Sequence, residues 1–129
     1  MKNDAMLPLQ KFVYDRLSSV LDYEVYDFVP QGAEFPYITI GEDEATDIGT
    51  KVDEGDSVYA QIHVWSRELG YLEVKSIMSD ILQTFSGRIK VPGFEECRPV
   101  RDYRTTYPDP DGLTRHGVLR FRFNLFEEK

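Results

Sequence analysis

Two histidines and two aspartates are the residues best suited to metal chemistry in this sequence of 129 residues. His116 follows a segment that carries Asp109 and Asp111, and imidazole and carboxylate groups are common zinc ligands. The two aspartates, however, stand at positions that a reverse turn favours, and a zinc site normally needs at least three convergent ligands. His63 falls in the middle of an expected strand. We therefore expect no metal site.

The single cysteine, Cys97, is the other candidate for chemistry. It has no partner for an internal disulfide, and a nucleophilic role needs a thiol with a lowered pKa. Its neighbours are Glu95, Glu96 and Arg98, so we interpret it as an ordinary cysteine at the start of a strand. The sequence has no glycine-rich phosphate loop, CxxC pair or HExxH motif. We expect no catalytic residue, no cofactor-binding residue and no cofactor.

Two functions of other classes remain as alternatives. One is a small metal-dependent hydrolase that uses His63, His116 and nearby carboxylates. The other is a ligand-binding module in which Tyr59, Trp65 and Tyr103 dock a peptide or small molecule. We interpret these aromatic residues instead as the second face of a sheet covered by a helix. A stoichiometric metal ion in the purified protein would favour the hydrolase.

Charge is distributed unevenly along the chain, whose net charge is -8. This balance makes general nucleic-acid binding a poor hypothesis. Residues 42–56 contain seven acids and one lysine, whereas residues 98–126 contain six arginines and three aspartates. The asymmetry suits head-to-tail contact between copies, although a solvated loop and an arginine-rich strand face explain it equally well. The interface residues that we predict are Glu42, Asp43, Glu44 and Asp47 on one side, and Arg101, Arg104, Arg115, Arg120 and Arg122 on the other.

Two helices are predicted to support these residues. Apolar side chains recur at helical spacing over residues 5–21 and again over residues 70–85. Asp4 and Ser66 are expected to cap the two helices, and Gly87 stands where a helix commonly ends. No apolar run is long enough to span a bilayer, and the first nine residues lack the apolar stretch of a signal peptide. We expect a soluble protein that is made in the cytoplasm.

Strands are predicted for residues 25–28, 37–41, 57–65, 98–107 and 114–126, with a short one at 88–91. The last long strand alternates, with Leu119, Phe121, Phe123 and Leu125 inward, and it follows a type I turn at residues 109–112. The acidic segment continues a strand to about Thr46 and then forms a mobile loop, about residues 47–56. Tight turns between strands indicate an α+β fold, with a mostly antiparallel β-sheet and two helices packed on it, in one domain over residues 1–129.

Three blocks of sequence carry a specific resemblance. The first contains Val25-Tyr26-Asp27, then residues 29–33 (VPQGA) and 35–41 (FPYITIG). The second is residues 63–67 (HVWSR) with Gly70, Glu73 and Ile77, and the third is residues 109–117 (DPDGLTRHG) followed by the strand 119–123. In this order and spacing, the blocks resemble a family of phage tail-completion proteins, also called tail terminators or tail-to-head joining proteins.

The resemblance implies an α+β fold without enzymatic activity or cofactor. It implies a homohexameric ring that caps the tail tube and contacts the tail-tube protein, the head–neck connector or stopper protein and other copies of itself. DNA would pass through the lumen without sequence-specific binding, and no membrane would be involved. The protein would belong to the virion of a phage, a prophage or a gene transfer agent, at the head–tail interface, after assembly in the host cytoplasm. Another role in the neck remains an alternative within the same class.

Overall fold

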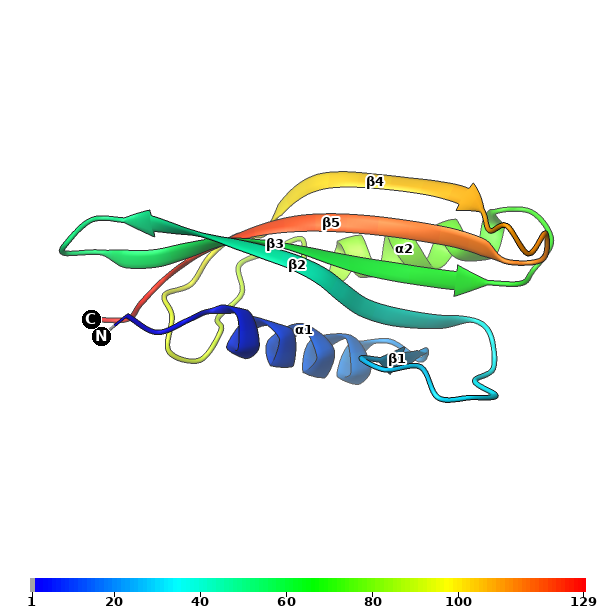
Figure 1. Cartoon of the computed structure of the whole chain (residues 1–129), viewed down its shortest axis with the longest axis horizontal. Helices are drawn as coiled ribbons and strands as arrows, with labels where there is room; N and C mark the ends of the chain where they lie inside the picture. The colour runs from blue at the N-terminus through cyan, green and yellow to red at the C-terminus, as the bar shows by residue number, and fades with distance from the viewer. Residues whose placement is uncertain (1) are drawn as a thin grey trace.

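The computed structural model describes residues 2–129. The elements are α1 (Met6–Val20), β1 (Glu24–Tyr26), β2 (Tyr37–Gly49), β3 (Glu54–Ser66), α2 (Leu72–Thr84), β4 (Val100–Pro108) and β5 (Arg115–Phe126). The strands form one sheet in the order β1-β2-β3-β5-β4 (Figure 1). Only β1 and β2 pair in parallel, and the other neighbours are antiparallel. The predicted α+β fold is therefore confirmed.

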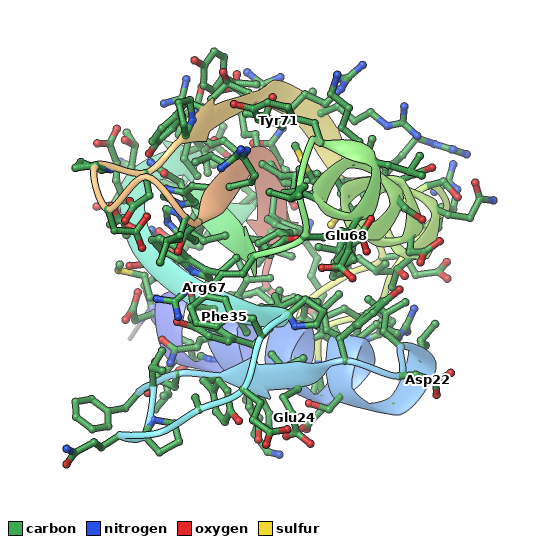
Figure 2. All side chains as sticks on the ribbon, turned by 90° about the vertical axis from the view of Figure 1, so that its right-hand side faces the viewer. Asp22, Glu24, Phe35, Arg67, Glu68 and Tyr71 are labelled. Carbon is green, nitrogen blue, oxygen red and sulfur yellow. The ribbon has the colours of Figure 1, made fainter. Side chains whose placement is uncertain are left out.

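Both helices pack on the same face of the sheet. The inward residues of β3 and β5 alternate, as predicted for β5, so Val58 faces the same side as its cross-strand partner Phe123, and Ile62 the same side as Leu119. The buried residues of α1 and α2 complete this core, as follows from the shared cluster of Leu9, Val13, Leu17, Val74, Ile77 and Ile81. Figure 2 views the sheet nearly along its strands, with α1 below and α2 to the upper right. In the part of the chain that the structure describes, the opposite face of the sheet carries no helix.

A glycine allows α2 to lie directly on β5. A Cβ atom at Gly117 would lie 2.6 Å from Sδ of Met78 and 3.0 Å from Cγ2 of Val74. These distances are shorter than a comfortable carbon contact. The absence of a side chain at this position therefore sets how closely the helix approaches the sheet.

The expected helix caps are corrected by the structure. Ala5, not Asp4, is the N-cap of α1, although Oδ1 of Asp4 accepts a hydrogen bond from Met6 N–H at 3.3 Å. The N-cap of α2 is Tyr71. Ser66 lies at the end of β3, where its hydroxyl donates to Oε1 of Glu73 in the first turn of α2 at 2.6 Å. This hydrogen bond therefore links the end of β3 to the first turn of α2, although Ser66 is not part of the helix.

The acidic segment is a β-hairpin, so the predicted loop over residues 47–56 is wrong. Residues 43–49 of β2 pair continuously with residues 54–60 of β3, and only residues 50–53 lie outside the strands. The turn closes with a hydrogen bond from Thr50 N–H to the carbonyl of Asp53 at 2.8 Å. The strand expected at residues 88–91 is also wrong, because the structure has only an isolated bridge between Ile89 and Cys97.

The molecule is elongated, with different segments at its two ends (Figure 1). The β2–β3 hairpin extends past the helices at the end where both termini lie. The opposite end carries the β4–β5 turn and the loop that leads into α2. Within residues 2–129, no helix has the length and apolar character needed to cross a membrane.

Candidate assembly interface

The helix-free face of the sheet carries aromatic side chains at one end. Tyr37, Trp65, His116 and Tyr107 stand opposite one another on four adjacent strands. Trp65 stacks on His116 with ring centroids 3.7 Å apart, and its indole N–H donates to Oγ1 of Thr39 at 3.0 Å. Within residues 2–129 no helix covers this face, so our interpretation of Tyr59, Trp65 and Tyr103 is corrected. Trp65 packs on His116, whereas Tyr59 and Tyr103 lie beside the guanidinium group of Arg120.

Two buried histidines meet beside this aromatic row. Nδ1 of His63 lies 2.8 Å from Nε2 of His116, and Nε2 of His63 lies 2.6 Å from Oε1 of Glu42. Burial, with the neighbouring His63 ring, lowers the pKa of His116 to about 4. His116 is therefore neutral at pH 7. If His116 donates its Nε2–H to His63, and His63 donates its Nε2–H to Glu42, the facing polar atoms are all satisfied.

The residues considered for a metal site are not arranged to hold a metal ion within the part of the chain that the structure describes. Both carboxylate oxygens of Asp111 serve the turn before β5, accepting from the backbone N–H groups of Leu113 and Thr114 and from the Thr114 hydroxyl. These bonds lower the pKa of Asp111 to about 2. Among residues 2–129, no group of three or more His, Cys, Asp or Glu side chains has a metal-binding arrangement.

The remaining candidate nucleophile lies in an unfavourable environment. Cys97 is partly buried, and burial raises the pKa of its thiol. A raised pKa decreases the thiolate fraction at neutral pH, which is the reverse of what a nucleophilic cysteine needs. The interpretation of Cys97 as an ordinary cysteine therefore agrees with its surroundings.

The four predicted acidic residues all lie on β2, but their environments differ. Glu42 has a positive φ of 41° at an irregularity in the β2–β3 pairing, and its carboxylate contacts His63. Asp43 pairs with the core residue Ala60, which places it toward the helices. Glu44 stands opposite Tyr59 on the helix-free face. Asp47 lies at the far end of β2 and forms an ion pair with Lys2.

The predicted arginines divide between the two faces of the sheet. Arg101 and Arg104 pair with the core residues Phe121 and Leu119, so both project to the helix side of β4. The guanidinium of Arg115 lies 5.5 Å from the ring centre of Tyr71. Arg120 and Arg122 alternate with the core residues of β5 and face the helix-free side.

One groove brings part of the two charged sets together on the helix-free face. Glu42 and Glu44 line one wall, Arg120 lies between the walls, and Asp102 of β4 lines the other; the full set is Glu42, Asp43, Glu44, Tyr59, Gln61, Asp102 and Arg120. Nε of Arg120 lies 2.5 Å from Oδ2 of Asp102. This arginine is therefore already paired within the chain.

Three charged residues that form ion pairs at or beside the predicted residues were not predicted themselves. Lys2 pairs with Asp47 and with Asp56, and Asp102 pairs with Arg120. Asp102 stands between Arg101 and Tyr103 at an irregularity in β4, and no local sequence pattern predicts this irregularity. Lys2 reaches residues far along the chain, so only the folded arrangement reveals its partners. Asp56 could have been identified from the sequence, because it lies two residues before Val58 and so falls in the same alternating register as the inward residues of β3.

Comparisons with known proteins agree on one family. The family model described as "Tail completion protein gp17" matches residues 14–125. Over 92 residues the chain is 27% identical to the Tail completion protein gp17 of Bacillus phage SPP1, a match that covers 70% of this chain and 68% of that protein.

Two solved structures share the fold. A chain from the virion of a native gene transfer agent particle has a TM-score of 0.70 at 20% identity, covering 88% of this chain and 91% of that chain. The structure of bacteriophage SPP1 gp17 has a TM-score of 0.56 at 24% identity, covering 92% and 89%. Because the family model spans most of the sequence, this chain belongs to the tail completion protein gp17 family, whose members are non-enzymatic structural proteins of phage tails.

Proposed function

We propose that this protein caps the phage tail tube and joins the tail to the head–neck connector, acting as a homo-oligomeric ring. The observation that carries the proposal is the family match over residues 14–125. The fold shared with a chain of a gene transfer agent virion supports the same assignment, because that chain is part of an assembled particle. Family membership also removes the hydrolase alternative.

The two ends of the molecule suit contacts with two different partners. The turn of the β2–β3 hairpin exposes Val52. The loop before α2 and the β4–β5 turn, at the other end, expose Leu69 and Leu113. Exposed apolar side chains on loops are available for protein contacts. In the proposed role, one end meets the tail-tube protein and the other meets the connector or stopper protein of the neck.

The overall charge suits a ring through which DNA passes. A net charge of -8 gives the protein little general attraction for phosphate, so a passing genome is not retained by non-specific binding. The protein then acts in the virion, at the head–tail interface, as a structural part of the DNA path.

Deletion of the gene in its parent phage or prophage tests this function. Negative-stain electron microscopy of the lysate should show full heads separated from tails whose ends are uncapped or overlong. Supply of the wild-type gene from a plasmid should restore joined particles. Normally joined particles in the deletion lysate would refute the proposed function.

A further inference from the structure

Two strand edges of the sheet have no partner strand within the described chain. β1 pairs with β2 only at Tyr37–Thr39, so residues 41–49 of β2 have β3 on one side and no strand on the other. At the opposite edge of the sheet, the nine residues of β4 (Val100–Pro108) pair only with β5. Exposed edges of this length readily pair with another chain.

Strand direction permits the two edges to meet in a rotationally symmetric assembly. β2, β3, β5 and β4 are antiparallel in succession, so β2 and β4 of one chain run in opposite directions. Copies related by rotation about an axis along the strands would therefore place β4 of one copy antiparallel to β2 of the next. Such a contact joins two different surfaces and closes into a ring when the rotation allows it.

The charges on the two edges are complementary. The free part of β2 contains Asp43 and Glu44, and β4 contains Arg101 and Arg104. Within residues 2–129, none of these four side chains takes part in an ion pair. In contrast, Asp102 of β4 is paired with Arg120 of its own chain. The unpaired charges therefore have opposite signs on opposite edges.

The side-chain directions agree with this pairing. Asp43 projects to the helix side of the sheet, because it stands opposite the core residue Ala60. Arg101 and Arg104 project to the same side, opposite Phe121 and Leu119. In a sheet that continues from one copy to the next, Asp43 lies on the same face as the two arginines, where the opposite charges attract each other, whereas Glu44 lies on the helix-free face.

We infer that the ring is built by antiparallel pairing of residues 100–103 of β4 of one copy with residues 41–44 of β2 of the next copy, which lie at the same level of the sheet and place Asp43 beside Arg101. This inference rests on the proposed function and names the surface through which the copies associate. Backbone hydrogen bonds supply the contact, and the charges select this edge pair over contact between two identical edges.

Charge reversal on each edge tests the inference by complementation of the deletion strain. Asp43→Lys with Glu44→Lys makes the β2 edge basic, and Arg101→Glu with Arg104→Glu makes the β4 edge acidic. Each pair should decrease the yield of joined particles by about tenfold or more, and the four changes together should recover most of it. Arg16→Glu with Arg88→Glu is the matched control away from both edges, and circular dichroism of each purified variant confirms folding.

A cross-link provides a second measurement that leaves the charges unchanged. Gly41→Cys and Tyr103→Cys, which lie in the same cross-strand row of the sheet, are combined with Cys97→Ser, and assembled particles are treated with a short bis-maleimide. Within one chain the two cysteines lie on opposite edges, about 15 Å apart across the sheet alone. A ladder of linked chains longer than a dimer should form, whereas each single-cysteine control should stop at a dimer.

Failure of this inference is distinguishable from failure of the proposed function. Separated heads and tails in the deletion strain, with normal yields from either reversed pair, would overturn the edge pairing alone. So would failure of the four combined changes to recover the yield, or the absence of the ladder in joined particles. Joined particles in the deletion strain itself would instead overturn the proposed function.

Discussion

Asp47 and Asp56 stand directly opposite each other on β2 and β3, and the ammonium group of Lys2 lies between their carboxylates. Its Nζ is 2.5 Å from Asp47 and 2.6 Å from Asp56. The other oxygen of Asp56 accepts a hydrogen bond from Ala5 N–H at the start of α1, at 3.0 Å. Like charges at opposed strand positions repel, so Lys2 stabilises the hairpin and ties it to the helix.

The first prediction compares how much the buried carboxylate of Asp56 and the exposed carboxylate of Asp47 contribute to stability. Asp56→Ala should lower the free energy of unfolding by on the order of 1–3 kcal/mol, because a buried carboxylate loses both its backbone donor and its ion pair. Asp47→Ala is the matched control and should cost less, because the Asp47 side chain is exposed. Urea denaturation at low salt measures both, and equal losses would contradict this assignment.

The second prediction concerns the pH dependence of stability. The folded pKa of His116 is about 4, below its ordinary value of 6.5. Between these values the unfolded chain binds a proton that the folded chain does not, so stability is fully present above pH 6.5 and falls as the pH decreases toward 4. The loss from this residue should be at most on the order of 3 kcal/mol.

Two measurements check the histidine prediction. The NMR chemical shift of the His116 ring should titrate with a midpoint near pH 4. His116→Gln should flatten the stability curve between pH 4 and 6.5, since the group responsible for it is gone. A His116 midpoint near 6.5 would show that the ring is not protected as the structure describes.

The third prediction concerns the turn of the β2–β3 hairpin. Gly49 has a φ of 104°, and a Cβ atom there would lie 1.9 Å from the carbonyl oxygen of Asp53. Gly49→Ala should therefore destabilise the protein by on the order of 1–3 kcal/mol and increase hydrogen exchange at the hairpin. At Gly41 an added Cβ meets no atom within 4 Å, so Gly41→Ala is the control. Equal effects of the two substitutions would contradict the turn geometry.

Elements with strong periodicity were predictable from the sequence. Apolar spacing predicted α1, and alternation predicted the inward residues of β5, because burial on one face imposes those periods. The hairpin was not predictable in the same way. Its strands are stabilised by cross-strand pairing and by Lys2, whose partners Asp47 and Asp56 lie 45 and 54 residues away. An acidic composition alone does not reveal such contacts.

The candidate interface shows a similar division. The uneven charge was visible in the sequence, but the directions of the arginines were not. Strict alternation would place Arg101 and Arg104 on opposite faces, whereas the irregularity between Arg101 and Tyr103 places both on the helix side. The contact between His63 and His116 depends on the pairing of β3 with β5 and has no local signal.

The fourth prediction concerns ionic strength. Exposed charges on separate copies are screened when the Debye length falls below about 8 Å, above physiological salt. In an extract that contains heads and tails from the deletion strain, added wild-type protein should join fewer particles as sodium chloride increases. The variant with all four reversed edge charges should show the same trend. A joining yield independent of salt would argue against electrostatic selection of the edges.

A cryo-electron microscopy reconstruction of the neck of the intact particle tests the central claim most directly. The account predicts a closed ring of this fold between the last ring of the tail tube and the head connector, with β4 of each copy beside β2 of the next. A neck without this fold, or particles in which the fold lies elsewhere, would contradict the proposed role. A ring at this position with β2 and β4 apart would preserve that role and reject the edge pairing.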